Sequence, residues 1–324
     1  MGLNQNEIIF KMVLPHESFT EENIFQRLQS LLWFEPTEVL MMSRGVTVPY
    51  RTESIHHVLR NEMKNSRFTF RIADSDEHKN YVSFTKLRYH SHISLLFDGE
   101  HVEVSDIIER LDKLVVNLDA ITAFGMSRDD FFWQNNQDPK YYKKHNKPLS
   151  DVKIIPDPIL TNRQRVDLRS LPGSVGYFQE IPFTSSWTMW FGPSFFNYVS
   201  FEMLMAYEGF WQKEILDRTC VRVSLYEHPW EYELPENREL QWRFKRYMNW
   251  DKIVEGLKTS GEASTASDPA IEFLTTQLAY GGDIRVNYYY NDDRQLVPRS
   301  QATMVEAYEL QKNGVVVWSN ITKL

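Results

Sequence analysis

The chain has 324 residues, of which 42% are hydrophobic and 25% are charged, as in ordinary folded globular proteins. Its formal net charge of −8 argues against nucleic acid or an anionic membrane as the main partner, because those surfaces are bound through clustered Lys and Arg. The single cysteine, Cys220, excludes an intrachain disulfide framework. No signal-peptide pattern and no apolar run of transmembrane length occurs, so we expect a cytoplasmic protein.

The first third of the chain predicts strands and helices in mixed order. Residues 7–14 form an apolar run typical of a buried strand. Ser18, followed three residues later by Glu21, has the pattern of a capping box and predicts the start of a helix. The further elements expected here are strands at 39–42, 67–73 and 81–97, and a helix capped by Ser105.

Apolar periodicity stops between residues 134 and 150, where polar and turn residues dominate. We therefore predict an N-terminal α+β domain over 1–133, a junction over 134–150, and an aromatic-rich C-terminal α+β domain over 151–324. Strands and helices mix without a regular βαβ alternation, which favours an α+β fold with mixed or antiparallel sheets and packed helices. A duplication that produced two similar α+β halves is an alternative.

The second half predicts strands around two well-marked helices. Ser200 is expected to cap a helix that ends near Tyr207, and helical apolar spacing extends over Pro235–Met248. Asp268-Pro269 has the pattern of a helix start, and Gly281-Gly282 that of its end. The other expected elements are strands at 174–180, 220–226, 283–290, 301–310 and 314–323, a connector at 259–267, and a hairpin turn at Asn313-Gly314.

Aromatic residues crowd the segment from 187 to 250, which holds six of the nine tryptophans. Large aromatic side chains favour cores and contact surfaces, because they bury much apolar area and still carry a polar group that needs a partner. Monomers rarely expose large apolar patches, so we expect most of this segment to be core. That expectation applies to Trp187, Trp190, Phe195 and Phe196.

Two histidines, His90 and His92, would lie on one face of the strand predicted at 81–97, a spacing that suits two metal ligands. The third ligand would come from His78, His101 or Asp98. Lys86 and Arg88 share that face and would repel a cation. We therefore expect no bound metal and no cofactor.

Two further groups have the residue types of a catalytic or metal site. Cys220 and His228 would form a thiol–imidazole pair if they met in space, although a lone cysteine in an apolar strand is usually a core residue. Asp129 and Asp130 would suit Mg²⁺, but acids also favour the first turn of a helix. We expect the core cysteine and the helix start.

The strongest candidate for a binding patch is the segment 226–236, in which acids alternate with aromatics. Carboxylates beside aromatics are typical of sugar-binding grooves and glycosidases, whereas the alternative is a solvated loop anchored by its rings. The predicted patch is Tyr226, Glu227, Trp230, Glu231, Tyr232 and Glu233.

Three runs resemble a block found in uncharacterised cytoplasmic proteins of Gram-positive bacteria, some of which are similar to immunity proteins of polymorphic toxins. The runs are Trp187–Phe196, Leu225–Trp230 and Glu236–Trp242, within residues 175–255. The resemblance implies a non-enzymatic protein that neutralises a toxin by binding it, and it assigns no functional residue. An acidic protein would suit a basic toxin domain as partner. The alternative is a carbohydrate- or phosphoester-active hydrolase with its acids near 226–236.

Overall fold

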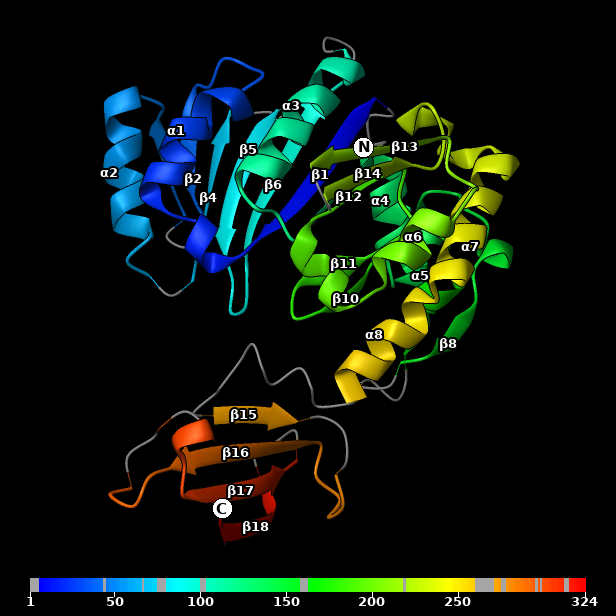
Figure 1. The fold of residues 1–324 in the computed structure, drawn as a ribbon. Helices are drawn as coiled ribbons and strands as arrows, with labels where there is room; N and C mark the ends of the chain where they lie inside the picture. Colours follow the sequence, from blue (N-terminus) through cyan, green and yellow to red (C-terminus); the bar gives the residue numbers. More distant parts are fainter. Residues whose placement is uncertain are drawn as a thin grey trace. The chain divides into compact units, whose positions relative to one another are not determined.

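The computed structural model describes residues 6–42, 45–65, 67–74, 80–99, 103–157, 163–217, 220–259, 271–274, 278–294, 297, 299–311 and 315–324. The chain divides into two compact units, Met1–Thr259 and Ser260–Leu324, each treated by itself below (Figure 1). The division follows Thr259, so the junction predicted at 134–150 is wrong.

Unit 1 is built on one antiparallel sheet of ten strands in the order β13-β14-β12-β7-β1-β6-β5-β4-β2-β3. This sheet and its packed helices confirm the predicted α+β fold. The strands are β1 (Glu7–Leu14), β2 (Glu38–Met41), β3 (Val46–Pro49), β4 (Phe68–Ala73), β5 (Tyr81–Lys86), β6 (Ser91–Asp98), β7 (Thr122–Ser127), β12 (Thr188–Phe191), β13 (Gln212–Asp217) and β14 (Cys220–Ser224).

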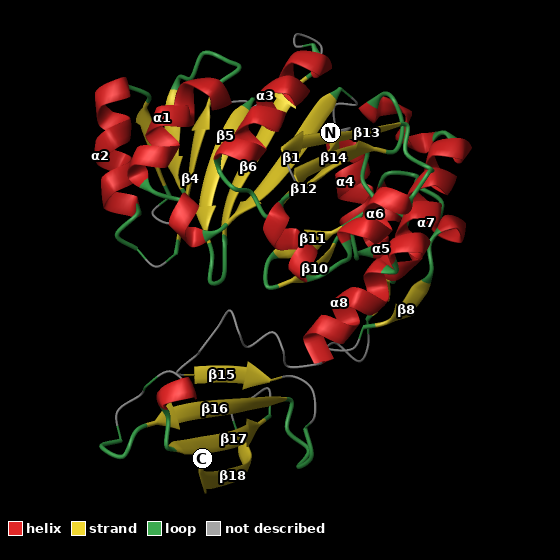
Figure 2. Ribbon diagram, in the orientation of Figure 1, coloured by secondary structure: helices red, strands yellow, loops and turns green. Residues whose placement is uncertain are grey.

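Helices α1, α2 and α3 lie over one face of the sheet, across β1 and the strands from β6 to β2 (Figures 1 and 2). Helices α4 to α8 gather near the end of the sheet that holds β12, β13 and β14. Their bounds are α1 (Glu21–Leu31), α2 (Thr52–Glu62), α3 (Val104–Asn117), α4 (Arg128–Asn135), α5 (Pro139–Lys144), α6 (Phe201–Ala206), α7 (Pro235–Met248) and α8 (Trp250–Thr259). Two small hairpins complete the unit, β8 (Ile154–Pro156) with β9 (Gln164–Val166), and β10 (Gly176–Phe178) with β11 (Ile181–Phe183).

The sheet crosses the predicted junction without a break, because β12 pairs with β7. Residues 134–150 contain the end of α4 and the whole of α5, and they pack around a small buried cluster that includes Trp133 and Tyr142. The Tyr142 hydroxyl donates to the carbonyl of Trp133 at 2.7 Å. Short helices held by a few rings carry little apolar periodicity, and for that reason the segment had the pattern of a linker.

The strand predicted over 81–97 is two strands, since the chain turns between β5 and β6, which pair with each other. The amide of Leu87 donates to the carbonyl of His90 at 3.0 Å and closes the turn. The carboxylate of Glu180 accepts the backbone N–H groups of Arg88, Tyr89 and His90. Side-chain alternation continues through this turn, so the sequence pattern alone did not reveal it.

Two helix starts differ from the predicted ones by two residues each. The N-cap of α1 is Thr20, whose hydroxyl accepts from the amide of Asn23, in place of Ser18. The N-cap of α3 is Glu103 in place of Ser105. Two predictions are confirmed, since Ser200 caps α6 and α7 spans Pro235–Met248.

Unit 2 is a four-stranded antiparallel sheet in sequence order, β15 (Ile271–Leu274), β16 (Ile284–Tyr290), β17 (Met304–Leu310) and β18 (Val316–Lys323). The helix predicted to follow Asp268-Pro269 is wrong, because β15 occupies part of that range. Pairing of Ile271 and Phe273 with β16 outweighs the local helix-start signal. Residues 260–267, Asp268-Pro269 and the predicted turn Asn313-Gly314 lie outside the described residues.

The aromatic segment is mainly core, as predicted. Trp190 and Phe195 are fully buried, and Trp187 is 3% exposed. Trp190 packs edge-on against Phe10 of β1, with ring centroids 5.8 Å apart. Phe196, also predicted to be core, is only half-buried, and two rings are exposed: Trp211, 54% exposed just before β13, and Tyr247, 38% exposed on α7.

This contrast gives a stability prediction. Trp190→Ala removes a fully buried ring and its hydrogen bond, so we expect the free energy of unfolding to fall by about 3–5 kcal/mol. Trp211→Ala, the matched control, should change it by less than about 1 kcal/mol. Urea unfolding followed by circular dichroism measures both, and similar losses for the two variants would contradict the assignment of Trp190 to the core.

Candidate functional site

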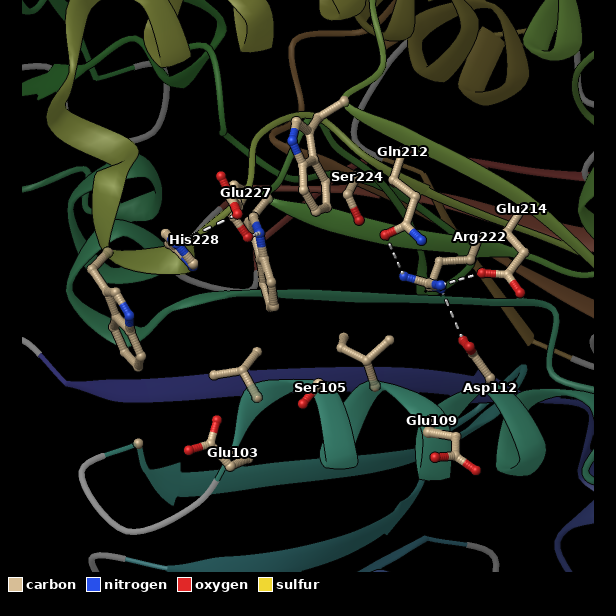
Figure 3. Close-up of a pocket in the computed structure, with 16 residues that line it drawn as sticks. Glu103, Ser105, Glu109, Asp112, Gln212, Glu214, Arg222, Ser224, Glu227 and His228 are labelled. Carbon is tan, nitrogen blue, oxygen red and sulfur yellow. Dashed lines mark hydrogen bonds and ion pairs between the residues drawn. The ribbon is translucent and has the colours of Figure 1, made fainter.

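A groove of about 850 Å³ lies between α3 and the strands β13 and β14 (Figure 3). Helix α3 presents one wall because it is amphipathic. Its buried face carries Ile107, Leu111 and Leu114, which pack onto the sheet. Its opposite side carries Glu103, Ser105, Glu109 and Asp112, which line the groove. The other wall includes Gln212, Glu214, Arg222 and Ser224 of the two strands, and Trp187, Trp211, Glu227, His228 and Trp230.

The inner end of the groove, formed by Asp112, Glu214 and Arg222, is an ion-pair network. The guanidinium of Arg222 bonds with the carboxylate of Glu214 and lies 3.2 Å from that of Asp112. The Gln212 side-chain oxygen accepts from the same guanidinium at 3.2 Å. Burial raises the pKa of Asp112, against the opposing effects of the Trp190 hydrogen bond and of Arg222. This guanidinium is therefore neutralised by carboxylates from both walls.

The outer end of the groove is formed by Glu103, Glu227, Trp187 and Trp230. Glu103 and Glu227 lie on opposite walls, away from Arg222 (Figure 3). The indole N–H of Trp187 donates to the carbonyls of Tyr226 and Glu227, at 3.0 and 3.2 Å, which fixes the ring. Glu227 also approaches the imidazole of His228 at 3.8 Å. Acids and indoles thus meet at this end.

Gly99 lets Trp230 reach the outer end. A Cβ at position 99 would lie 2.3 Å from the Trp230 ring and 2.9 Å from the carbonyl oxygen of Asn6. Glycine is thus required there by the close approach of two neighbours. The same contact places the Trp230 ring beside the chain that leads into α3.

The groove carries far more acid than base. Five carboxylates line it, against one guanidinium and the imidazole of His228. A second hollow, of about 460 Å³, shares Trp211 and Glu227 with the groove and adds Glu208, Glu231 and Glu236. Among its described lining residues there is no Lys, Arg or His. We call the groove and this hollow together the acidic face.

The patch predicted from sequence is divided by the structure. Glu227 and Trp230 line the groove, and Glu231 lines the second hollow with Glu227. Glu233 pairs with Lys147 at 2.8 Å and lines a separate pocket of about 470 Å³. These residues therefore contribute to three different surface features.

The prediction that Tyr226 and Tyr232 belong to the exposed patch is wrong. They are 3% and 5% exposed. The Tyr232 hydroxyl donates to the carboxylate of Asp129 at 2.7 Å, which holds the ring inside. Burial raises the pKa of both hydroxyls. Local sequence placed these rings on a loop, but the partner of Tyr232 comes from α4, about a hundred residues earlier, and the hydroxyl of Tyr226 accepts from Gln241 of α7.

Asp129 and Asp130 begin α4, as expected, and both are held by protein groups. Asp129 also accepts from the indole N–H of Trp133 at 3.0 Å. Asp130 is fully buried and pairs with Arg238 at 2.7 Å, and burial raises its pKa against the opposing effect of Arg238. These contacts link the start of α4 to Tyr232 through Asp129 and to α7 through Asp130.

The paired histidines do not share a strand face, because His90 lies in the turn before β6 and His92 lies on β6. Burial, helped by Lys11, lowers the pKa of His92 to about 4 and keeps the imidazole neutral at physiological pH. The described residues contain no group of three His, Cys, Asp or Glu placed to hold a metal ion, while His78 and His101 lie outside them.

Cys220 is a buried residue at the start of β14, and His228 is largely exposed. Burial raises the pKa of the thiol to about 12, and the carboxylates of Asp112 and Asp217 add to this effect. The thiol is therefore protonated at neutral pH and is a poor nucleophile.

The sequence matches no known protein-family model and no curated protein. No helix in the described parts of the chain combines the length and apolar character needed to cross a bilayer.

The raised pKa of Cys220 predicts slow alkylation. At pH 8 the native thiol should react with iodoacetamide at least about 100-fold more slowly than in the urea-unfolded chain, because thiolate is the reactive form. Mass spectrometry of timed samples measures this without ambiguity, since the chain has a single cysteine. Rapid labelling of the folded protein would restore Cys220 as a candidate nucleophile.

Gly99→Ala should displace the Trp230 ring from the groove. We expect a loss of about 1–3 kcal/mol of unfolding free energy from overpacking, together with a shifted indole signal for Trp230 in ¹⁵N–¹H spectra. Gly256, which has open space around its Cβ position, offers the matched control Gly256→Ala. An unmoved Trp230 signal in the Gly99 variant would show that the ring does not lie on Gly99.

Proposed function

We propose that this chain is a non-enzymatic cytoplasmic protein that binds a basic partner protein at the acidic face, in the manner of an immunity protein that neutralises a toxin. The observation that carries the proposal is the imbalance of charge in the groove. Five carboxylates line it, and its one guanidinium already bonds with two of them. Such a surface accelerates capture of a positively charged protein.

Exposed aromatic surface supports the same function. Trp211 lines both parts of the acidic face and is 54% exposed, and Ile215 of the edge strand β13 is 53% exposed. Tryptophan is enriched among residues that contribute most to protein–protein affinity. Carboxylates around an exposed indole combine electrostatic steering with an apolar anchor.

Hydrolysis of a carbohydrate or phosphoester is the second candidate function. It is favoured by one observation, that Glu227 and Glu231 line the second hollow together with Trp211. Two carboxylates beside an aromatic ring are the groups that a glycosidase uses.

The proposal is tested by capture from cells of the native host with paired baits. The first bait carries Glu103→Gln, Glu227→Gln and Glu231→Gln on the acidic face. The matched control carries Glu17→Gln, Glu35→Gln and Glu255→Gln, three exposed acids that line neither part of that face. We expect a basic protein to be retained by wild type and control and lost by the first bait.

The captured protein is then purified and its association rate measured at several salt concentrations. The acidic-face variant should associate more slowly, with a weaker salt dependence, because exposed charges act over a screened distance. Equal rates for all three baits would contradict the proposal. Substrate turnover in a hydrolase screen that is lost in Glu227→Gln would contradict the binding function and support the hydrolase function.

A further inference from the structure

We propose that the outer end of the groove binds the guanidinium of an arginine side chain supplied by the partner. The inference rests on the proposed function and names the group that this face recognises. It follows from a comparison of the two ends of the same groove.

The inner end shows how this groove holds a guanidinium. Arg222 lies between Asp112 of α3 and Glu214 of β13, so each wall supplies one carboxylate. The outer end also has one acid on each wall, with Glu103 at the start of α3 and Glu227 just after β14 (Figure 3). Among the described residues lining the groove, Arg222 is the one arginine, so none lies at the outer end.

The Trp230 ring at the outer end favours a planar organic cation. Trp187 is buried and its N–H donates to two backbone carbonyls, whereas Trp230 is half-buried and its ring lies against Gly99. Indole faces attract cations, and arginine stacks on them better than lysine does. Ca²⁺ and Mg²⁺ take six or more oxygen ligands, more than Glu103 and Glu227 provide.

The two carboxylates should contribute unequally. Glu103 is the N-cap residue of α3, where the positive end of the helix dipole already favours its negative charge. Glu227 lies beside the imidazole of His228 and before the short 3-10 helix Pro229–Glu233, whose dipole is much smaller than that of the 14-residue α3. Glu227 should therefore provide most of the attraction for a guanidinium.

Titration calorimetry with short peptides tests the proposal on the full chain. The probes are acetyl-Gly-Gly-Xaa-Gly-Gly-amide with arginine, lysine or citrulline at Xaa, at low salt. Citrulline keeps the shape of arginine and removes its charge. We expect the arginine peptide to bind at least about tenfold more tightly than the citrulline peptide, the size of one charge-assisted hydrogen bond.

Glu227→Gln should remove the preference for arginine, Glu103→Gln should weaken it, and Glu35→Gln, on a surface outside the groove, should leave it unchanged. Equal binding of the arginine and citrulline peptides, or a preference that survives Glu227→Gln, would overturn the proposal. A lysine peptide that binds as tightly as the arginine peptide would overturn the choice of a guanidinium.

The two proposals fail separately. A preference for arginine without any captured protein would leave the guanidinium site standing and remove the proposed function. A partner captured through the acidic face, with no preference among the peptides, would support the proposed function and remove the guanidinium site.

Discussion

The carboxylate of Asp112 is the contact on which the groove depends. It accepts from the indole N–H of Trp190 on β12 at 2.6 Å and lies 3.2 Å from the guanidinium of Arg222 on β14. One side chain of α3 is thus tied to two neighbouring strands. Because the Arg222 side chain is only 8% exposed, loss of one partner would leave a poorly solvated charge, which is strongly unfavourable. This link fixes α3 beside the end of the sheet, and the groove follows from that placement.

The two ends of the groove differ in how their charges are balanced. At the inner end the carboxylates meet a guanidinium, which offsets the desolvation of Arg222 and Asp112, while Glu214 is half-exposed. At the outer end Glu103 and Glu227 are exposed, so water stabilises their charge, and the basic group beside Glu227 is the imidazole of His228. The face can therefore carry an excess of acid without destabilising the fold, and that excess is available to a positively charged partner.

The sequence predicted those features that local patterns determine. Helix α7 begins with Pro235 and ends before Asn249, which adopts a left-handed conformation with φ of 56°, so both limits have local causes. The turn between β5 and β6 was missed, because its stabilising carboxylate, Glu180, lies about ninety residues away. Likewise β15 is a strand through its pairing with β16, against its own helix-start signal.

The same distinction applies to the site. Glu227 and Trp230 were found because they lie close together in one aromatic and acidic segment. Glu103, Asp112 and Arg222 come from α3 and β14, which only the fold of the sheet brings together. Tyr232 was misplaced for a related reason, since its partner Asp129 belongs to the distant helix α4.

Recognition of a guanidinium at the outer end of the groove can be tested directly by chemical-shift mapping of the nine indole N–H groups. Ethylguanidinium is added to ¹⁵N-labelled protein, with ethylurea as the uncharged control. With ethylguanidinium alone we predict saturable shifts that are largest at Trp230 and confined to the indoles that line the groove. Shifts spread over indoles outside the groove, or equal shifts with ethylurea, would contradict the account.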